Sequence, residues 1–314
     1  MKFNNVGISG IGSYLPPTLR TGKEIESLAD TNEEWIYSKL GIKERRNALN
    51  LTPSDLGVKA ALEALKDANL SKDDIDMIIV ATSSGEKTSP STACIIHNKL
   101  APQHNIPAFD VNAVCAGFVY ALSLAGSLIN SKTYKNILVI GTEVYSKITD
   151  WKDRNCVFFG DGAGAVVISN SNKGWMSVEL NANGGGTGMT GFTLKPGQTY
   201  KTNPKEVWNQ AVSVLPNSIT SILNSNGLSV DDIDHFVPHQ ASINMLKLIA
   251  DKVDLPHTKL RTVMDKYANI AGASIPIVLD DIKHQGMLNK GNKLLLTAIG
   301  SGWAWGSVIL NYDE

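Results

Sequence analysis

The sequence is poor in cysteine and in charged residues. It has three cysteines among 314 residues, Cys94, Cys115 and Cys156, and no C-x-x-C pair, so it predicts neither a disulfide framework nor a zinc site. We therefore expect no bound metal. Charged residues make up 19% of the chain, against roughly 25% in an average soluble domain, and hydrophobic residues make up 43%. This composition excludes intrinsic disorder and predicts a large apolar interior.

The sequence also lacks an excess of charge of either sign and lacks long hydrophobic runs. Its 29 basic and 30 acidic residues give a net charge of -1, which provides no electrostatic basis for binding nucleic acid or an anionic membrane. The best apolar run, Met77–Ala81, has the length of a strand rather than the ~18 residues of a transmembrane helix. Asparagine and glycine interrupt the first residues, which do not read as a signal peptide. We expect a cytoplasmic protein with no nucleic-acid or membrane partner.

One segment recurs half a chain later. LKDANLSKDDIDMIIVATSS, from Leu65, and LNSNGLSVDDIDHFVPHQAS, from Leu223, share the phrase L-S-x-D-D-I-D, in which Leu70 matches Leu228. Two copies are too few for a solenoid, so the repeat predicts a duplicated domain. Chance recurrence is the open alternative, because this phrase is also a generic exit from a helix into a strand.

Each copy predicts a helix, a polar turn and a buried strand. The helices span 56–68 and 212–223, with Pro216 starting or kinking the second, and β-branched strands follow them. Alternating strands and helices predict an α/β fold with mostly parallel sheets covered on both faces. We assign one half to residues 1–170 and the other to residues 171–314, joined by a segment rich in Gly, Thr and Asn at 180–204. Further strands are expected at 137–140, 165–168, 294–298 and 308–310.

Cys115 is the candidate nucleophile. In PAFDVNAVCAGFVYALSLAGSLI, residues 107–129, a strand turns into a helix at Cys115, and apolar residues at helical spacing predict that this helix is buried. The first turn of a helix offers unpaired N–H groups and the positive end of the dipole, which favour a thiolate. Packing of the cysteine as a small hydrophobe is the alternative. Cys94 and Cys156 have no comparable setting, and we expect both to be packing residues.

Two polar residues of the second half are further candidates. His239 ends the short strand in HFVPHQ, at the sheet edge where α/β proteins bind ligands, although a structural histidine is the alternative. Asn269, in YANIAGASIP, lies among small residues, which suggests a buried and directed amide rather than a turn former. The flanks of the other histidines predict surface or turn positions. The glycine stretches at 160–164 and 300–306 match neither a phosphate loop nor a dinucleotide motif and predict tight turns.

These segments together resemble a known family. VNAVCAGFVYAL, VPHQASINM, YANIAGASIP, FFGDGAGAVV and GSGWAWGSVIL are similar, in sequence and in order, to the beta-ketoacyl-acyl-carrier-protein synthase III group of the thiolase superfamily. The similarity runs from ISGIGSYLP near the N-terminus to the last strand. It implies the thiolase-like fold, in which two duplicated halves form an α-β-α-β-α layered sandwich, and it implies a homodimer.

The resemblance also implies decarboxylative condensation of acyl thioesters. Cys115 would take an acyl group from an acyl-CoA. His239 and Asn269 would then each donate a hydrogen bond to the enolate of a malonyl thioester, carried on coenzyme A or on acyl carrier protein. The backbone N–H groups of Cys115 and Ser301 would form the oxyanion hole of the loading step. No cofactor is implied, because coenzyme A thioesters are the substrates.

A coenzyme A tunnel is a further implication of the resemblance. Trp35 matches a tryptophan that stacks on adenine, and Trp208 falls where the family has a phenylalanine that lines the pantetheine arm. Lys39 and Arg154 match basic positions near the nucleotide phosphates. Aromatic stacking combined with cations is a physically sensible way to hold an adenine nucleotide.

Three residues depart from the family pattern. Asn244 stands where the family has an arginine that docks the carrier protein, and Ala304 replaces a threonine. Ser89 replaces a phenylalanine that closes the acyl pocket across the dimer, and the loss of a ring predicts a preference for longer or bulkier acyl groups over acetyl. Two alternatives stay open. One is a ketosynthase of specialised metabolism that forms quinolones, resorcinols or ketones, and the other is a non-catalytic partner subunit.

Overall fold

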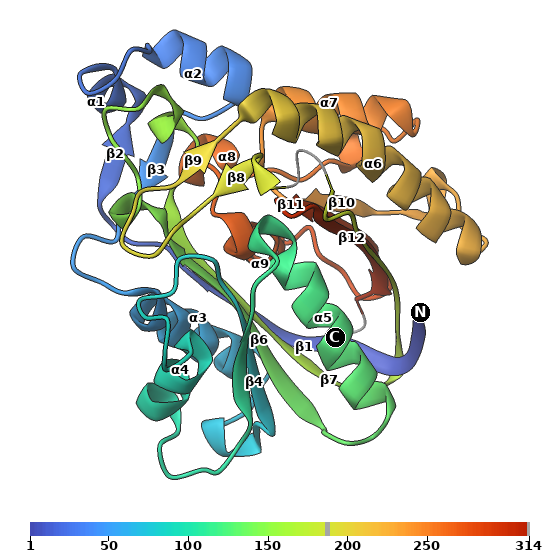
Figure 1. The fold of residues 1–314 in the computed structure, drawn as a ribbon. Helices are drawn as coiled ribbons and strands as arrows, with labels where there is room; N and C mark the ends of the chain where they lie inside the picture. Colours follow the sequence, from blue (N-terminus) through green and yellow to red (C-terminus); the bar gives the residue numbers. More distant parts are fainter. Residues whose placement is uncertain (186–188, 313–314) are drawn as a thin grey trace.

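Helices and strands alternate along the whole chain (Figure 1). The computed structural model describes residues 1–185 and 189–312. Up to residue 182 the elements are β1 (Lys2–Tyr14), β2 (Leu19–Thr21), α1 (Gly22–Glu26), α2 (Glu33–Leu40), β3 (Glu44–Arg46), α3 (Pro53–Asp67), β4 (Met77–Ala81), α4 (Thr92–Leu100), β5 (Ala108–Val111), α5 (Gly117–Asn130), β6 (Asn136–Val144) and β7 (Asp161–Ala182). They are followed by β8 (Phe192–Thr193), β9 (Lys201–Thr202), α6 (Pro204–Ser225), β10 (His235–Pro238), α7 (Ile243–Lys252), α8 (Met264–Tyr267), α9 (Ser274–His284), β11 (Lys293–Gly300) and β12 (Ala304–Asn311). Short 3₁₀ helices include η1 (Lys72–Asp74), η2 (Val114–Ala116), η6 (Val230–Asp232) and η8 (Ala271–Ala273).

The main sheet is mixed and is organised around its longest strand. Its order is β5-β4-β6-β7-β12-β11-β10, with β1 antiparallel beside β7. The first part of β7 pairs with β6 over 161–169, and its last part pairs with β12 over 176–182. The predicted division at residue 170 therefore falls inside β7, between these two pairings. The predicted joining segment, 180–204, contains the antiparallel pair β8 and β9, and its residues 186–188 lie outside the described part of the chain.

The helices and the two parts of the sheet, one around β6 and the other around β12, form five layers. α5 and α9 pack in one hydrophobic core with strands from both parts of the sheet. α3 and α4 cover the outer side of β4, β6 and β7, whereas α6 and α7 cover the outer side of β10, β11 and β12. In Figure 1 these two helix pairs lie at opposite ends of the molecule, with α5 between them. The order of layers is α-β-α-β-α, which confirms the predicted fold class.

The repeated phrase folds in the same way twice. Each copy begins with a 3₁₀ helix that a serine caps, η1 in the first and η6 in the second. Asp76 then accepts a hydrogen bond from the N–H of Asn136 (3.0 Å), and Asp234 accepts one from the N–H of Lys293 (2.7 Å). In both copies this aspartate ties the start of one strand to the start of its parallel neighbour.

The loops that lead into the two central helices also correspond. Asn112 Oδ1 accepts a hydrogen bond from the N–H of Val114 (3.3 Å), and Asn269 Oδ1 accepts one from the N–H of Ala271 (2.8 Å). Val114 and Ala271 both have a positive φ, of 49° and 38°. Each loop continues through a 3₁₀ helix, η2 or η8, into a buried helix, α5 or α9. Duplication explains these shared details better than chance does.

Four expectations from the sequence differ from the structure. The main sheet is mixed rather than mostly parallel, because β7 runs antiparallel to its neighbours β1, β6 and β12. α6 begins at Pro204 rather than near residue 212, because proline fits the first position of a helix, so Pro216 lies inside it. Cys94 is exposed rather than packed, since it lies on α4 beside the edge strand β5 and its Sγ donates to Ala108 O. His235 is buried rather than at the surface, because it begins β10, whose residues are all buried.

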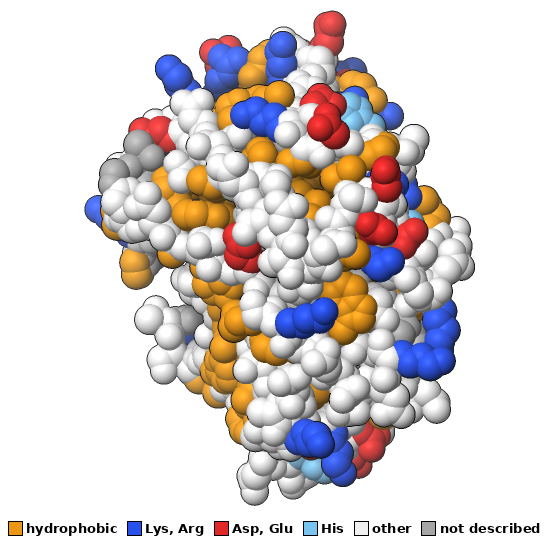
Figure 2. Space-filling model, turned by 90° about the vertical axis from the view of Figure 1, so that its right-hand side faces the viewer, with side chains coloured by type: hydrophobic (Ala, Val, Ile, Leu, Met, Phe, Trp, Pro, Cys, Tyr) orange, Lys and Arg blue, Asp and Glu red, His pale blue; other side chains and the backbone are white. Residues whose placement is uncertain are grey.

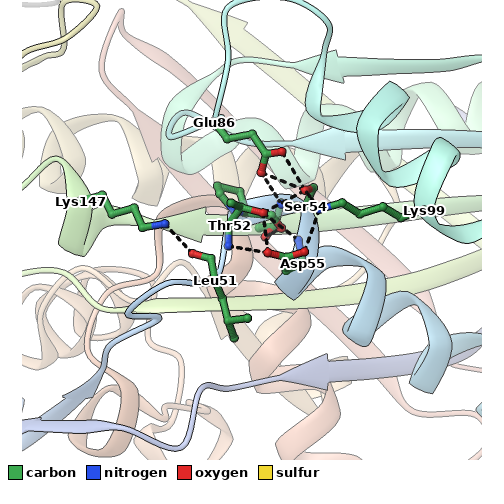
Figure 3. A network of polar contacts seen from close by, with 9 residues as sticks. Leu51, Thr52, Ser54, Asp55, Glu86, Lys99 and Lys147 are labelled. Atoms are coloured by element: carbon green, nitrogen blue, oxygen red, sulfur yellow. Dashed lines mark hydrogen bonds and ion pairs between the residues drawn. The ribbon is translucent and has the colours of Figure 1, made fainter.

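A polar network fixes the start of α3 and the loop that leads to Ser89 (Figure 3). The buried Ser54 hydroxyl donates to the Glu86 carboxylate (2.9 Å), and Lys99 of α4 donates to Ser54 Oγ (2.6 Å) and to Asp55 (2.8 Å). Burial opposes ionisation of Asp55, but hydrogen bonds, chiefly from Lys99, outweigh it and lower the pKa of Asp55 to about 2. The network thereby anchors Glu86, three residues before Ser89.

The surface carries charges of both signs. On the face shown in Figure 2, basic and acidic side chains are interspersed, in keeping with the net charge of -1. Hydrophobic side chains reach this face in scattered groups between them. Within the described ranges, no helix is both long enough and apolar enough to cross a membrane.

Candidate active site

A cavity of about 360 Å³ collects most of the predicted site residues. Its lining comes from α2, from α6, from the start of α7 and from the loops before α5 and α9, segments that are far apart in the sequence. The predicted site residues that line it are Trp35, Lys39, Cys115, Trp208, His239, Asn269 and Ser301. Apolar and aromatic side chains supply much of the remaining wall, as is usual for a pocket that binds a small molecule.

Cys115 lies in η2 at the entry to the central helix α5, where the sequence predicts it. Its loop packs tightly against the end of β11, since a Cβ at Gly300 would lie 2.1 Å from Ala113 O. Burial raises the pKa of the Cys115 thiol, and the nearby carboxyl of Glu143 raises it further. The thiolate predicted from the helix start is therefore disfavoured, and Cys115 is a thiol in the free protein.

His239 directly follows β10 at the carboxyl end of the strand. Its N–H donates to Thr297 O (2.8 Å), which extends the pairing of β10 with β11 to this residue. The side chain is 5% exposed. Burial lowers the pKa of His239 to about 4, although a backbone hydrogen bond at Ala271 partly opposes this shift. The imidazole is thus neutral near pH 7, a form that has one N–H donor and one nitrogen acceptor.

Asn269 is held by its backbone and by its own side chain. Its N–H donates to Phe158 O (3.1 Å), and its carbonyl accepts from Gly160 N–H (3.0 Å). A Cβ at Gly160 would lie 2.5 Å from Tyr267 O, so this approach requires glycine and explains the FFGDG motif. Asn269 Oδ1 accepts from Ala271 N–H (2.8 Å), which leaves the amide nitrogen as the donor available to the cavity.

The turn after β11 joins the cavity to the short strand β8. Gly300 ends β11 beside the Cys115 loop, and Ser301 follows it in the cavity wall. The Ser301 hydroxyl accepts a hydrogen bond from the N–H of Phe192 (2.9 Å), the first residue of β8. Reasoning from the sequence considered only the backbone of Ser301. The structure gives its side chain a contact of its own.

Aromatic rings form the wall beside Cys115. Tyr145 stacks on Phe159 with ring centroids 4.2 Å apart. Tyr200 contacts both Phe159 (5.1 Å) and Phe192 (5.4 Å). The cluster packs against Cys115, and its Phe159 and Phe192 line the cavity, so an acyl group on Cys115 would meet these two rings.

Three of the predicted coenzyme A residues lie together where α2 borders the cavity. Trp35 and Lys39 are one turn apart on α2, and Trp208 comes from α6. Arg154 does not line the cavity, but its guanidinium lies over the Trp35 ring, 4.9 Å from the ring centroid. An aromatic ring and two cations are therefore grouped here, as expected for a nucleotide site.

Asn244 ties α7 to α2. Its side-chain amide donates to Ser38 O and to Lys39 O, at 3.1 Å each. The last carbonyls of a helix have no partner within the helix, and α2 ends nearby, with Gly41 as its left-handed cap (φ 82°). The sequence marked Asn244 as a departure from a docking arginine and did not predict this contact.

Two other predicted residues lie outside the cavity. Ser89 is exposed on the loop before α4 and does not line the cavity of its own chain, so its effect on the acyl pocket stays a prediction. Cys156 is buried, as expected of a packing residue. Across the described ranges, no group of three His, Cys, Asp or Glu side chains is arranged to hold a metal ion.

The chain is similar to known proteins over its whole length. The family described as 3-oxoacyl-[acyl-carrier-protein (ACP)] synthase III matches residues 109–184, and the C-terminal part of the same family matches residues 223–312. The beta-ketoacyl-[acyl-carrier-protein] synthase III of Clostridium acetobutylicum is 40% identical over 99% of this chain and 100% of that protein. The enzyme of the same name from Oceanobacillus iheyensis is 41% identical over 99% of this chain and 100% of that protein.

Solved structures agree with these relatives. The 3-oxoacyl-[acyl-carrier-protein] synthase III of Aquifex aeolicus superposes with a TM-score of 0.94 at 37% identity, over 98% of this chain and 100% of that one. The priming beta-ketosynthase of the R1128 polyketide pathway superposes with a TM-score of 0.92 at 29% identity, over 99% of this chain and 97% of that one.

The fold and these relatives define a condensing enzyme, that is, an acyltransferase of the beta-ketoacyl synthase type. The match extends over both halves of the chain and over the full length of the relatives. The chain belongs to the 3-oxoacyl-[acyl-carrier-protein] synthase III family. The resemblance drawn from the motifs is thereby confirmed.

Proposed function

We propose that the protein transfers an acyl group from an acyl-CoA to Cys115 and condenses it with a malonyl thioester to give a 3-oxoacyl product. The observation that carries this proposal is the convergence of Cys115, His239 and Asn269, from three separate segments, on one cavity. The names of the relatives include acyl carrier protein, which favours this carrier for the malonyl group. Malonyl-CoA is the alternative.

Loading begins with a thiol, because burial and Glu143 raise the pKa of Cys115. His239 is neutral near pH 7 and can accept the proton as the sulfur attacks the thioester carbonyl. The tetrahedral oxyanion is held by the backbone N–H groups of Cys115 and Ser301. Its collapse breaks the bond to the sulfur of coenzyme A, which leaves as a thiol with the proton from His239.

Condensation then uses the same two polar side chains as donors. The malonyl thioester loses carbon dioxide, and its C–C electron pair forms an enolate whose oxygen needs hydrogen-bond donors. The imidazole N–H of His239 and the amide N–H of Asn269 supply them, and both of these donors are uncharged groups. The enolate carbon attacks the acyl carbonyl on Cys115, and the sulfur leaves as a thiolate that takes up a proton from solvent.

The acyl donor enters at the end of the cavity that Trp35 and Lys39 line. We infer that adenine stacks on Trp35, and that Lys39 and Arg154 bind the phosphates. Trp208 lines the path of the pantetheine arm toward Cys115. These assignments rest on the resemblance and on the grouping of the four side chains.

We also propose that the enzyme is a homodimer. Among the described strands, β5 pairs with β4 alone and ends the sheet. Phe109 of β5 is 36% exposed, and Cys94 beside this edge is exposed as well. An open edge strand with an exposed ring favours pairing with a second copy. Sedimentation should give a dimer, and Phe109→Lys should shift it toward the monomer. A monomer in the unaltered protein would refute the proposal.

A ketosynthase of specialised metabolism is the second candidate. The similarity to the priming beta-ketosynthase of a polyketide pathway supports it, as does the replacement of a ring by Ser89. It would use the same residues and differ in the acyl donor. A non-catalytic subunit is disfavoured by the presence of all three reactive side chains.

Intact-protein mass spectrometry tests the proposal directly. The protein is mixed with acetyl-, butyryl-, octanoyl- and benzoyl-CoA, and each loaded group appears as its own added mass. Cys115→Ala should abolish loading, whereas Cys94→Ala and Cys156→Ala should leave it intact. Acyl mass that persists on the Cys115→Ala protein would refute the assignment. The ranking of the four donors separates the two candidate functions.

A further inference from the structure

The duplication gives the Cys115 loop a counterpart without a nucleophile. The loops at Asn112 and Asn269 share their turn, their positive φ and their entry into a central helix, so Gly272 of η8 corresponds to Cys115 of η2. A Cβ at Gly272 would lie 3.4 Å from Ala81 O and 3.4 Å from Glu143 Oε1. The second loop therefore also faces the ends of two parallel strands, β4 and β6.

The strand pairings identify what corresponds to Glu143. In one half Val80 of β4 pairs with Ile140 of β6, and in the other half Pro238 of β10 pairs with Thr297 of β11. Three residues further along, Glu143 of β6 therefore corresponds to Gly300 of β11. Ala81 corresponds in the same way to His239.

The two halves carry different residues at this position, Gly300 in one and Glu143 in the other, and the difference decides whether a substrate oxyanion can bind there. Next to Cys115 stands Gly300, which contributes no side chain, and we have assigned the oxyanion of the loading step to this place. Next to Gly272 stands Glu143, whose Oε1 accepts a long hydrogen bond from the Gly272 N–H (3.4 Å). A carboxylate oxygen thus occupies, in one half, the counterpart of the oxyanion position in the other.

Glu143 is buried and accepts several hydrogen bonds. Its side chain is 0% exposed. It accepts from the N–H of Ser83 (3.2 Å) and from the hydroxyls of Ser83 (3.1 Å), Ser84 and Thr82 (3.3 Å). Ser84 Oγ in turn accepts from the N–H of Val144 (2.9 Å), the residue that corresponds to Ser301. Both backbone donors of the counterpart site are therefore bound directly or indirectly to Glu143.

We propose that Glu143 is a positioning residue of the condensation step: its carboxylate fills the counterpart of the oxyanion hole and thereby holds η8, the segment that orients the Asn269 amide. The proposal rests on the proposed role of Asn269 as an enolate donor. Gly272 lies one residue beyond Ala271, whose N–H binds Asn269 Oδ1. Without the hydrogen bond from Gly272 N–H to Glu143, this turn becomes more mobile, and the Asn269 amide is no longer oriented toward the enolate oxygen.

Glu143 also acts on Cys115, with the opposite consequence. Burial raises the pKa of Glu143 to about 7, while the hydrogen bonds from Ser84, Ser83 and Gly272 favour the ionised form. The negative charge raises the pKa of the Cys115 thiol. Removal of the charge should therefore ease deprotonation of Cys115 and speed its loading, even as condensation is impaired. A residue that served only stability would impair both steps together.

Glu143→Gln tests this, because it keeps the size of the side chain, removes its charge and replaces one of the two acceptor oxygens by a donor. Loading from acyl-CoA is followed by intact mass, and condensation is followed by single turnover of the preloaded enzyme with malonyl thioester. We expect the rate of condensation to fall by at least tenfold, which corresponds to a rise of about 1.4 kcal/mol in the activation free energy. The rate of loading should be unchanged or higher. Asp280→Asn is the matched control, since Asp280 is also a buried carboxyl on a hydrogen bond, from Ser13, and lies two turns along α9. It should change neither step.

Equal losses in loading and condensation, or an unchanged condensation rate, would overturn the proposal. If Glu143→Gln does not fold, Ser84→Ala removes one donor to Glu143 and the acceptor of Val144, and it should lower condensation selectively. An unaffected condensation rate in Ser84→Ala would likewise overturn it. Failure of the unaltered enzyme to load Cys115 would instead refute the proposed function, so the two failures are distinguishable.

Discussion

Asn269→Asp isolates the condensation step from the loading step. The new carboxyl can keep the hydrogen bond from Ala271 N–H, now 2.8 Å, and the backbone contacts to Phe158 and Gly160 do not depend on the side chain. Only the donor nitrogen is lost, and an oxygen that repels the enolate replaces it. Loss of one oxyanion donor costs about 3–4 kcal/mol, or roughly 100- to 1000-fold in rate. We expect this loss in condensation, with loading of Cys115 nearly unchanged.

The pH dependence of the same variant gives a second readout. The site at residue 269 is 6% exposed, and burial raises the pKa of a carboxyl. Lower pH should protonate the new group, restore a donor and relieve part of the defect. Asn112→Asp is the matched control, because Asn112 makes the same turn in the other half but is exposed and does not line the cavity. Equal losses in both half-reactions of Asn269→Asp would refute the reasoning and make Asn269 a structural residue.

Three further predictions follow from single contacts. Ser301→Ala removes the acceptor of the Phe192 N–H, so the wall beside Cys115 should loosen and the kcat/KM ratio of octanoyl-CoA to acetyl-CoA should rise; an unchanged ratio would contradict this. Asn244→Ala removes the donor to two carbonyls at the end of α2. A loss of about 1 kcal/mol in the free energy of acyl-CoA binding should raise KM about fivefold and leave kcat unchanged. A fall in kcat alone would exclude this role. His239 has a pKa of about 4 when folded against 6.5 as its ordinary value, so the unfolded chain binds the extra proton first. Stability should therefore be complete above pH 6.5 and fall by about 3 kcal/mol toward pH 4, and urea titrations should find this slope reduced in His239→Gln.

Much of the fold follows from local patterns in the sequence. The run Met77–Ala81 is a strand with the predicted bounds, and the strands expected at 137–140, 165–168, 294–298 and 308–310 all lie within strands of the structure. The helix predicted from residue 212, with Pro216 starting or kinking it, instead begins at Pro204 with Asn203 as its cap. Propensity marks where a helix can begin but does not choose between two prolines. The cap at Asn203, whose side chain accepts a hydrogen bond from the N–H of Glu206 (3.4 Å), marks the start that the structure uses.

The candidate site likewise contains residues that local sequence patterns predict and residues that they do not. Cys115, His239 and Asn269 were predicted because each lies where a strand or a helix changes direction beside small residues, and one cavity contains all three. The hydroxyl of Ser301 and the amide of Asn244 were not predicted, because each binds a backbone group more than a hundred residues away. No local pattern encodes such a partner. Glu143 did leave a signal, a single carboxyl within the apolar strand ILVIGTEV, but only the structure reveals what it faces.

The counterpart loops account for the roles that we propose for the two halves, with the nucleophile in one and the enolate donor in the other. Both halves aim a backbone N–H from the start of a buried helix at the end of a neighbouring strand. In one half the strand ends in Gly300, whose missing side chain leaves room for a substrate oxygen. In the other, Glu143 stands one residue before the end of β6 and supplies an oxygen of its own. A carboxyl group of the protein at this place holds the loop but excludes a second thioester, and it suits a loop whose proposed task is to present the Asn269 amide. Because the two central helices share one hydrophobic core, one loop can be fixed by the protein while the other stays open to substrate.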